Sequence, residues 1–309
     1  YMNALVTNPL VSIVIPVYNR ELYIEDAIKS AISQTYQNIE IIIVDNCSTD
    51  LTWSILNTWA SKDHRIKIYQ NKTNIGPVLN WNECFKHASG EYIKILWSDD
   101  WMALDFIERA VNLIDEKSAF VISNHKIVSE NGIVDNVKYK KQKYTRKEYL
   151  YNILFQNIEK FPLSPGCALF RTKDLNDNFV IDIPNTDGLD SKKNGAGNDL
   201  LIFLNIVLNY AHISILQYDG SFFRAHKESF SIQNQLELYY EWAKVYFIQK
   251  KLNKTYYSNI KKIMFWQQIN KGNKIYHNLY VCLKYNYWMP LSFCIIILGG
   301  VLNSLRNRK

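Results

Sequence analysis

The sequence predicts an α/β fold, a doubly wound and mostly parallel Rossmann-like sheet, followed by a basic, aromatic, helical C-terminal region. Two observations predict the sheet. Over residues 11–116, short apolar segments alternate with segments that have one apolar helical face. This alternation is the sequence pattern of βαβ units. The fourth apolar segment, 91–97, leads to the adjacent carboxylates Asp99 and Asp100. Ligands of open α/β sheets bind beyond the carboxyl ends of such strands.

The first half contains four strand–helix units. Segment 11–17 (VSIVIPV) is a buried strand closed by proline, and segment 39–44 is β-branched at most positions. The polar cluster 45–50 can turn the chain and cap the next helix. The full set of expected elements is strands 11–17, 39–44, 65–70 and 91–97, with helices 23–34, 51–61, 78–88 and 103–116.

The second half has a looser pattern. A turn at 130–132 separates two expected strands, and segment 185–198 is rich in Asn, Gly, Lys and Asp, as in loops that form lids. An apolar helix follows it. The expected elements are strands 119–123, 133–138, 166–171, 212–216 and 222–224, with a helix over 200–208.

Composition excludes several classes of protein. The chain has 309 residues, a net charge of +7 and 48% hydrophobic residues, which is enough for a sizeable core and argues against disorder. Its five cysteines are widely spaced and lack a C-x-x-C pair, so neither a disulfide framework nor a zinc site is expected. The first residues do not resemble a secretory leader.

The positive charge is concentrated at one end. Residues 240–309 contain 12 Lys or Arg and one Glu, whereas the rest contains 24 basic and 28 acidic residues. Such asymmetry indicates an anionic partner, either a membrane or nucleic acid. Segment 288–302 is apolar but is shorter than the ~20 residues of a spanning helix. It is expected to anchor at the membrane interface, or alternatively to pack on the body.

The Asp99–Asp100 pair allows two interpretations. Carboxylate oxygens are suitable ligands for Mg²⁺ or Mn²⁺, which can in turn hold a substrate's phosphates. Alternatively, Ser98 or Asp99 caps the following helix and the pair has no chemical role. The motifs that precede the pair in the chain favour the interpretation as a metal site.

Five motifs in order carry a family resemblance: 12–19 (SIVIPVYN), 44–50 (VDNCSTD), 74–76 (NIG), 88–92 (ASGEY) and 98–100 (SDD). A weaker match continues at 198–199 and 223–226, with Ser229 and Ser231. Over residues 10–232 the chain resembles the family 2 nucleotide-sugar glycosyltransferases of bacterial surface-polysaccharide synthesis, which have the GT-A fold. The resemblance implies a catalytic domain over 1–235, with a nucleotide-sugar half (10–116) and an acceptor half (117–235). Region 236–309 is then the membrane-associating part.

The resemblance also implies residue roles. Asp199 is the general base of an inverting reaction, and Asp99 and Asp100 hold the metal, Mn²⁺ or Mg²⁺. At position 46 the family usually has a carboxylate, and an amide stands here. The implied donor-binding residues are Pro16, Tyr18, Asp45, Asn46, Asn74, Asp99, Asp100, Arg224 and His226.

Structural alternatives remain open for four of these residues. The Asp45–Asn46 pair can serve as a turn, and Asp199 can cap the helix that follows it. His226 can be an ordinary surface histidine.

The expected function is transfer of a sugar from a UDP-sugar to a polyprenyl-diphosphate-linked glycan, in O-antigen or capsule synthesis. The protein is expected to lie peripherally on the cytoplasmic face of the bacterial inner membrane, with no nucleic-acid partner. One alternative is a sugar-phosphate nucleotidyltransferase, which would prefer a Gly-rich basic loop where residues 16–20 read PVYNR. A second is a non-catalytic membrane-bound binding protein, which would not need Asp99, Asp100 and Asp199.

Overall fold

The computed structural model describes residues 8–156, 159–185, 187–226 and 236–251. The described residues belong to one compact unit that ends at Lys251, and residues 252–309 lie outside the described residues. The expected apolar anchor at 288–302 and most of the basic region therefore lie outside them as well. No helix within the described ranges is long and apolar enough to cross a membrane.

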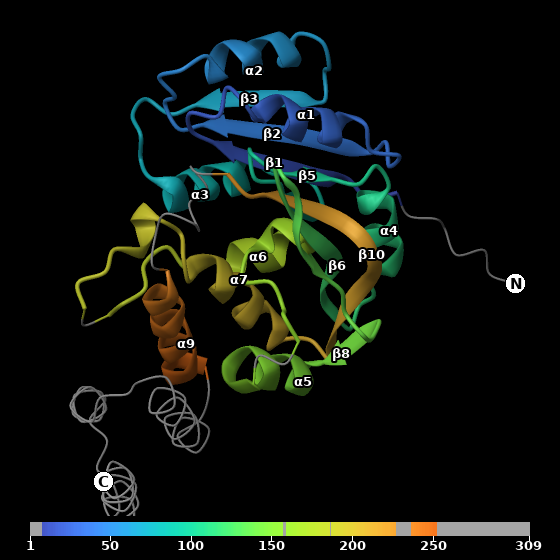
Figure 1. The fold of residues 1–309 in the computed structure, drawn as a ribbon, viewed down its shortest axis with the longest axis vertical. Coiled ribbons are helices and arrows are strands. Elements are labelled where there is room, and N and C mark those ends of the chain that lie inside the picture. The colour runs from blue at the N-terminus through green and yellow to red at the C-terminus, as the bar shows by residue number, and fades with distance from the viewer. Residues whose placement is uncertain (1–7, 157–158, 186, 227–235, 252–309) are drawn as a thin grey trace, which may run out of the picture. The chain divides into compact units, whose positions relative to one another are not determined.

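Ten strands of the described chain form one sheet, whose main path runs β3-β2-β1-β4-β9-β6-β10-β5 (Figure 1). The first four strands pair in parallel. Their bounds are β1 Val11–Val17, β2 Ile39–Asp45, β3 Ile66–Gln70 and β4 Tyr92–Ile95. These agree closely with the sequence-based expectation. Strands β1 and β2 are fully buried and rich in β-branched residues, and the shorter β3 and β4 contain two isoleucines each.

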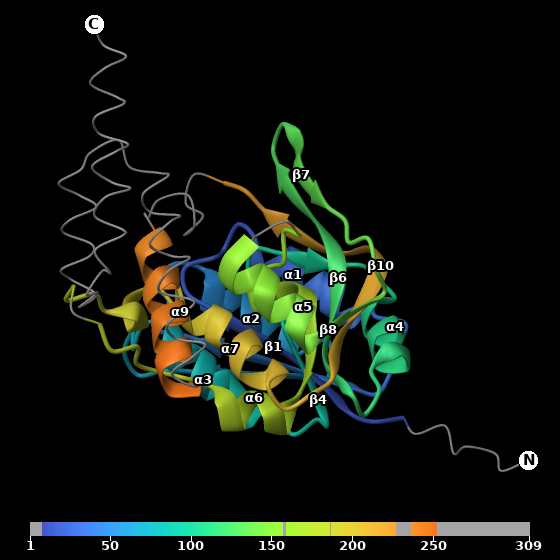
Figure 2. The same ribbon diagram turned by 90° about the horizontal axis from the view of Figure 1, so that it is seen from below.

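The second half of the sheet is mixed. Strand β9 (Ala168–Arg171) is antiparallel to both neighbours, β4 and β6, so β6 again runs in the direction of β4. Strand β10 pairs in parallel with β6. The remaining strands are β5 Trp101–Met102, β6 Ser118–Ser129, β7 Gly132–Val137, β8 Lys143–Thr145 and β10 His212–Arg224. The β6–β7 hairpin projects beyond the body of the sheet (Figure 2).

Helices pack against both faces of the sheet. One core joins the inward side chains of β1 and β2 to the apolar faces of α1, α2 and α4. On the other face, α3 packs on β1 and β2, α6 on β9 and α7 on β6. The helices are α1 Ile24–Ile32, α2 Thr52–Ala60, α3 Pro77–His87, α4 Phe106–Leu113, α5 Arg146–Tyr151, α6 Thr172–Asn178, α7 Asn198–Val207 and α9 Glu237–Lys251. Short helical turns lie at η1 Asn152–Gln156, η2 Pro165–Cys167 and η3 Ser191–Lys193.

The structure departs from the expected elements at several places, among them an unexpected strand β8 and a longer β6. The two expected strands at 212–216 and 222–224 are one strand, β10, with register irregularities against β6. Residues Trp101 and Met102 form β5 against β10, so α4 begins at Phe106 and not near Ala103. Helix α6 was not expected, since its sequence TKDLNDN has little apolar periodicity.

Helix α9 belongs to the compact unit that ends at Lys251. Sequence analysis placed its residues in the basic membrane-associating region. Its buried side chains include Trp242, Ala243 and Phe247, and it packs against α7. The apolar face of α9 therefore determines where this helix lies, despite the basic composition of the segment.

Strand direction determines where the site forms. Because β1, β2, β4 and β10 all run the same way, their carboxyl ends meet at one edge of the sheet. The expected site residues follow those ends: Tyr18 after β1, Asn46 after β2, Asp99 after β4 and His226 after β10. This edge is where an open α/β sheet binds its ligand.

Candidate active site

Asp100 and Arg224 connect two strand ends at this edge. The backbone N–H of Arg224 donates to Oδ1 of Asp100 at 2.8 Å, and its Nε donates to the carbonyl oxygen of Asp99 at 3.0 Å. The end of β10 is thereby fixed against the loop that follows β4. The expected grouping of Asp99, Asp100 and Arg224 is therefore present.

Asp99 contacts an imidazole and a guanidinium group. Its Oδ2 is 3.1 Å from Nε2 of His226 and 3.5 Å from Nε of Arg20. The ring of His226 packs on Tyr23, with 4.5 Å between ring centroids. His226 is buried, so it is not the ordinary surface histidine that the sequence left open.

Asp100 is only 6% exposed. Burial raises the pKa of its carboxyl well above the usual value, and the charge of neighbouring Asp99 raises it further. The N–H of Arg224 and the charge of Lys94 oppose this rise only in part. Two adjacent carboxylates, one of them buried, are thus held where a cation would relieve their repulsion.

Lys94 lies on β4 just before these carboxylates and is fully buried. Burial lowers the pKa of its amino group to about 8. Its Nζ donates to the carbonyl oxygens of Ile95 and Gly166. Lys94 therefore ties β4 to η2 beneath the site.

The residues after β2 form a second cluster. The amide of Asn46 donates to Oδ1 of Asn74 at 2.8 Å and accepts from Nδ2 of Asn71 and the N–H of Ile75, both at 3.0 Å. Asp45 is fully buried and accepts from the Ser48 N–H and hydroxyl. The turn role left open for Asp45 is therefore present, and the buried amide of Asn46 is joined by a hydrogen bond to the exposed side chain of Asn74.

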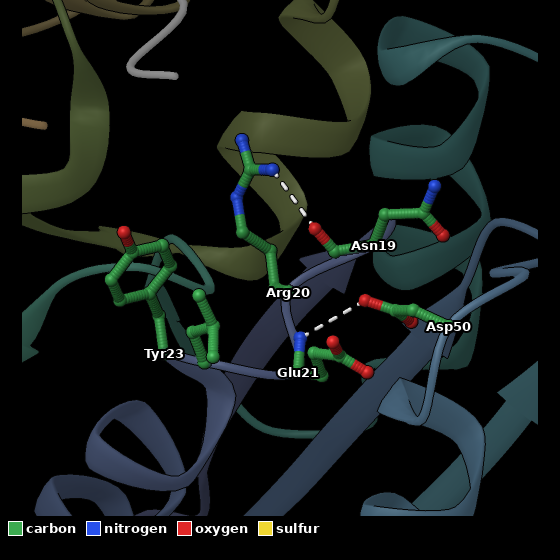
Figure 3. Close-up of a pocket in the computed structure, with 6 residues that line it drawn as sticks. Asn19, Arg20, Glu21, Tyr23 and Asp50 are labelled. Atoms are coloured by element: carbon green, nitrogen blue, oxygen red, sulfur yellow. Dashed lines mark hydrogen bonds between the residues drawn. The ribbon is translucent and has the colours of Figure 1, made fainter. Parts of the chain in front are cut away.

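A pocket of about 210 Å³ opens beside the end of β1 (Figure 3). It is lined by residues 19–23 and by Asp50. The Glu21 N–H donates to Oδ2 of Asp50 at 3.1 Å, and Arg20 projects from the same loop. Nearby, Pro16 is buried within β1, whereas Tyr18 is 40% exposed. Tyr18 therefore has the free face that stacking on a base requires.

Asp199 stands in the first turn of α7 and is buried. Its Oδ1 accepts from the N–H groups of Gly197 and Leu200, at 2.9 and 2.7 Å, and its Oδ2 accepts from the Tyr240 hydroxyl at 2.9 Å. Gly197, not Asp199, is the N-cap residue. Burial raises the pKa of Asp199 to about 7, because these hydrogen bonds offset only part of the desolvation.

The loop before α7 connects Asp199 with the Asp99–Asp100 pair and with the cluster that contains Asn46 and Asn74. The Asp199 N–H donates to the carbonyl oxygen of Gly195, and Gly195 sits directly on the ring of Trp81. Trp81 in turn packs on Trp97, with 4.9 Å between ring centroids, and Trp97 precedes the carboxylates by two positions. The carbonyl of Lys192 in this loop also lies close to Gly76, next to Asn74.

Comparison with known proteins identifies the family of this chain. The family model described as "Glycosyl transferase family 2" matches residues 12–179, more than half of the chain. The chain belongs to glycosyl transferase family 2.

Relatives and solved structures fit this assignment. An uncharacterized glycosyltransferase of Haemophilus influenzae is 40% identical over 121 residues, covering 39% of this chain and 46% of the relative. The putative teichuronic acid biosynthesis glycosyltransferase TuaG of Bacillus subtilis is 36% identical over 125 residues, covering 40% of this chain and 50% of TuaG. The chain thus matches about half the length of these relatives.

The structure of S. aureus TarS 1–349 in complex with UDP-GlcNAc is similar in fold. Its TM-score is 0.64 with 26% sequence identity, over 82% of this chain and 70% of that one. The expected GT-A fold is therefore confirmed, as is the expected family.

Among the described residues of this family 2 chain, there is no group of three or more His, Cys, Asp or Glu side chains that could hold a metal ion by themselves. The donor set at the edge is the Asp99–Asp100 pair. Hard carboxylate oxygens suit Mg²⁺ or Mn²⁺, and Mg²⁺ commonly binds through one or two carboxylates together with substrate phosphates. The raised pKa of Asp100 fits such a cation, because a positive charge there would favour the ionised form.

Three contributors to the site were missed by sequence reasoning. Arg20 reaches Asp99, Asp26 accepts from Nη2 of Arg224 at 2.7 Å, and Tyr240 reaches Asp199. The sequence signal for Arg20 is its place directly after the 12–19 motif. Asp26 and Tyr240 carry no such signal, because only the folded chain brings them to their partners.

Proposed function

We propose that this glycosyltransferase is an inverting enzyme that moves a sugar from a nucleotide-diphosphate donor to a hydroxyl of an acceptor. One observation carries the proposal: Asp99 and Asp100 stand at the carboxyl edge of the sheet, held against Arg224 of β10. A carboxylate pair flanked by Arg20, Arg224 and His226 is suited to a diphosphate with its counter-cation.

The nucleotide would bind over the ends of β1 and β2. The exposed ring of Tyr18 offers a stacking face for the base. The Asn46 amide oxygen already accepts from Asn71 and Ile75 and one of its N–H groups donates to Asn74, so its second N–H would be the group that contacts a base edge. A uridine diphosphate sugar is the proposed donor, and the likeness to TarS, solved with UDP-GlcNAc, supports it.

Departure of the diphosphate leaves negative charge that must be stabilised. Arg20 and Arg224 place two guanidinium groups beside Asp99 for this purpose. Asp99 and Asp100 would hold Mn²⁺ or Mg²⁺, which when bound neutralises charge on the phosphate oxygens.

Asp199 would act as the general base. Its pKa of about 7 is matched to a base that operates near neutral pH. It would take the proton of the acceptor hydroxyl as that oxygen attacks the anomeric carbon, while the bond from that carbon to the phosphate oxygen breaks. One displacement from the opposite face inverts the anomeric configuration.

The acceptor is proposed to be a polyprenyl-diphosphate-linked glycan used to build a bacterial surface polysaccharide such as O-antigen or capsule. The likeness to TuaG, named for teichuronic acid biosynthesis, supports this class of product. The 12 basic residues in 240–309 would place the enzyme peripherally on the anionic cytoplasmic face of the inner membrane.

A donor screen tests the reaction. UDP-, GDP- and dTDP-sugars are compared by thermal shift with and without Mn²⁺. The nucleotide-sugar that stabilises the protein most is then assayed for sugar transfer to a bacterial lipid extract. We expect a UDP-sugar to stabilise the protein more with Mn²⁺ and to be transferred with inversion. Stabilisation by every nucleotide alike without turnover, or retention of configuration, would overturn the proposal.

Membrane attachment is tested separately by deleting residues 288–309. The full chain should float with vesicles containing phosphatidylglycerol and should remain unbound to neutral vesicles. Deletion should reduce flotation, because it removes the apolar segment and the basic residues that follow it. Equal flotation of both forms would contradict an anchor in this segment.

A further inference from the structure

Helix α9 lies against the part of the chain that carries Asp199. A Cβ added to Gly197 would come within 3.0 Å of both the Tyr239 carbonyl oxygen and the Ala243 Cβ, so the helix packs closely on the start of α7. Nε1 of Trp242 donates to Oδ2 of Asp187 at 2.8 Å, in the loop before α7. Helix α9 therefore holds both the helix start and the preceding loop.

The hydrogen bonds to Asp199 are distributed unequally between its two carboxylate oxygens. Oδ1 accepts from two backbone N–H groups, those of Gly197 and Leu200. Within the described chain, the hydrogen bond to Oδ2 comes from the Tyr240 hydroxyl. Oδ1 therefore accepts two hydrogen bonds and Oδ2 accepts one, which makes Oδ2 the less occupied oxygen of the carboxylate. Oδ2 is accordingly the oxygen with more room to take up a proton.

We propose that Tyr240 is a positioning residue for the base Asp199: its hydroxyl fixes Oδ2 so that the remaining acceptor position of that oxygen faces the acceptor hydroxyl. The inference rests on the proposed role of Asp199. It makes α9 part of the catalytic unit and not only a connection toward the basic region. Donation by Tyr240 also stabilises the carboxylate form of Asp199, which keeps the base ionised near neutral pH.

A simple packing role for Tyr240 makes different predictions. Packing depends on the ring, which phenylalanine retains, whereas positioning depends on the hydroxyl. Tyr240→Phe therefore removes the hydrogen bond and leaves the ring against Asp199. Tyr246→Phe is the matched control, since Tyr246 is a half-buried tyrosine on the same helix.

The test uses the full-length chain and the donor that the screen identifies, with water as acceptor and release of the nucleoside diphosphate as readout. Tyr240→Phe should lower kcat by about tenfold, the loss expected for one hydrogen bond to a charged group. The KM for donor should not change. The acidic limb of the kcat–pH profile should move up by roughly one unit, because the carboxylate has lost a donor. Tyr246→Phe should behave as wild type.

Asp199→Asn separates the two proposals. If Asp199→Asn keeps full turnover, the base lies elsewhere and the proposed function fails at that point. If Asp199→Asn is inactive while Tyr240→Phe keeps the wild-type kcat and acidic limb, only the role of Tyr240 is overturned. Adding Tyr240→Phe to Asp199→Asn should cause no further loss. Thermal unfolding of each variant shows whether a lost rate reflects lost fold.

Discussion

The backbone N–H of Arg224 donates to Oδ1 of Asp100 across 124 positions of sequence. This bond joins the last strand of the sheet to the loop after β4. The guanidinium of Arg224 then lies over the rings of Trp101 and Tyr23, at 4.9 and 5.2 Å from their centroids. The carboxylate pair is thus held by backbone and aromatic contacts that do not depend on a ligand.

Asp100→Asn tests whether that carboxylate acts in turnover. The amide oxygen can still accept from the Arg224 N–H, and the buried charge beside Asp99 is removed, so the fold should be retained. Metal-dependent turnover should fall by roughly 10²-fold, because charge stabilisation by the cation is lost. Steady-state kinetics over a Mn²⁺ titration measures the effect.

Asp177→Asn is the control for this change, since Asp177 is an exposed aspartate on α6 paired with Lys173. It should leave both rate and Mn²⁺ dependence unchanged. Wild-type turnover by Asp100→Asn would remove Asp100 from the mechanism.

Asp199→Asn tests the buried carboxylate through stability as well as rate. The folded pKa of Asp199, about 7, is above the ordinary value of 3.8. Protonated Asp199 is therefore favoured by folding, and the stability it contributes is full below about 3.8 and lost as pH rises through about 7. The asparagine variant cannot ionise and escapes that loss.

We therefore expect Asp199→Asn to unfold with a higher free energy than wild type at pH 8, by roughly 2–4 kcal/mol, while turnover is abolished. The difference should shrink toward pH 5. Urea unfolding at the two pH values measures it, and wild-type kcat should rise with pH through about 7. An asparagine variant that is less stable at pH 8 would show that Asp199 is held for structure.

Glu40 fixes the framework beneath the nucleotide half. Its Oε1 accepts from the hydroxyl of Ser12 and from the N–H and hydroxyl of Ser89, and its Oε2 accepts from Nζ of Lys67. Burial raises the pKa of Glu40, but the hydrogen bonds from Lys67, Ser12 and Ser89 outweigh burial and hold the pKa at about 2. Its contribution to stability is present above about 4.5 and lost as pH falls through about 2.

Glu40→Gln should lower the free energy of unfolding at pH 7 by about 1–2 kcal/mol, a modest value because Lys67 is half-exposed. The difference from wild type should diminish below pH 4.5. Lys67→Met removes only the half-exposed partner and should lower the free energy of unfolding by less than Glu40→Gln does. Equal stability of Glu40→Gln and wild type at pH 7 would contradict this account.

Sequence reasoning predicted the parallel half of the sheet because each strand there is a self-contained apolar run between clear turn signals. The family resemblance implied that Asp99, Asp100, Arg224 and His226 act at one site, and they meet because β4 and β10 end at the same edge of the sheet. The physical reason for one motif became visible only in the structure. A Cβ on Gly90 would lie 2.7 Å from the Leu10 carbonyl oxygen and the Ser12 nitrogen, so this glycine permits close backbone packing.

The remaining features depend on contacts between distant segments. Strand β10 is continuous because β6 and β8 pair with it, although its sequence is interrupted by polar residues at 217–221. Helix α9 joins the body because Trp242 and Tyr240 find partners near α7. Local periodicity contains no information about such partners, which is why composition assigned α9 to the basic region.

Gly195→Ala tests the loop that joins Asp199 to the aromatic pair. Gly195 has φ +76°, and a Cβ added to it would overlap the ring of Trp81. Gly188, in the same segment, has φ +69° and open space within 4 Å of the position that an added Cβ would take. Both alanine variants carry similar backbone strain of about 1 kcal/mol, but only Gly195→Ala must also displace Trp81.

The donor KM should therefore rise and kcat fall in Gly195→Ala alone, whereas Gly188→Ala should keep wild-type kinetics. Steady-state kinetics of the two variants measures this difference, and thermal unfolding measures the strain that they share. Because Trp81 packs on Trp97 next to the carboxylate pair, a displaced Trp81 ring disturbs the donor side of the site. Equal kinetics in the two variants would mean that the contact with Trp81 does not shape the site.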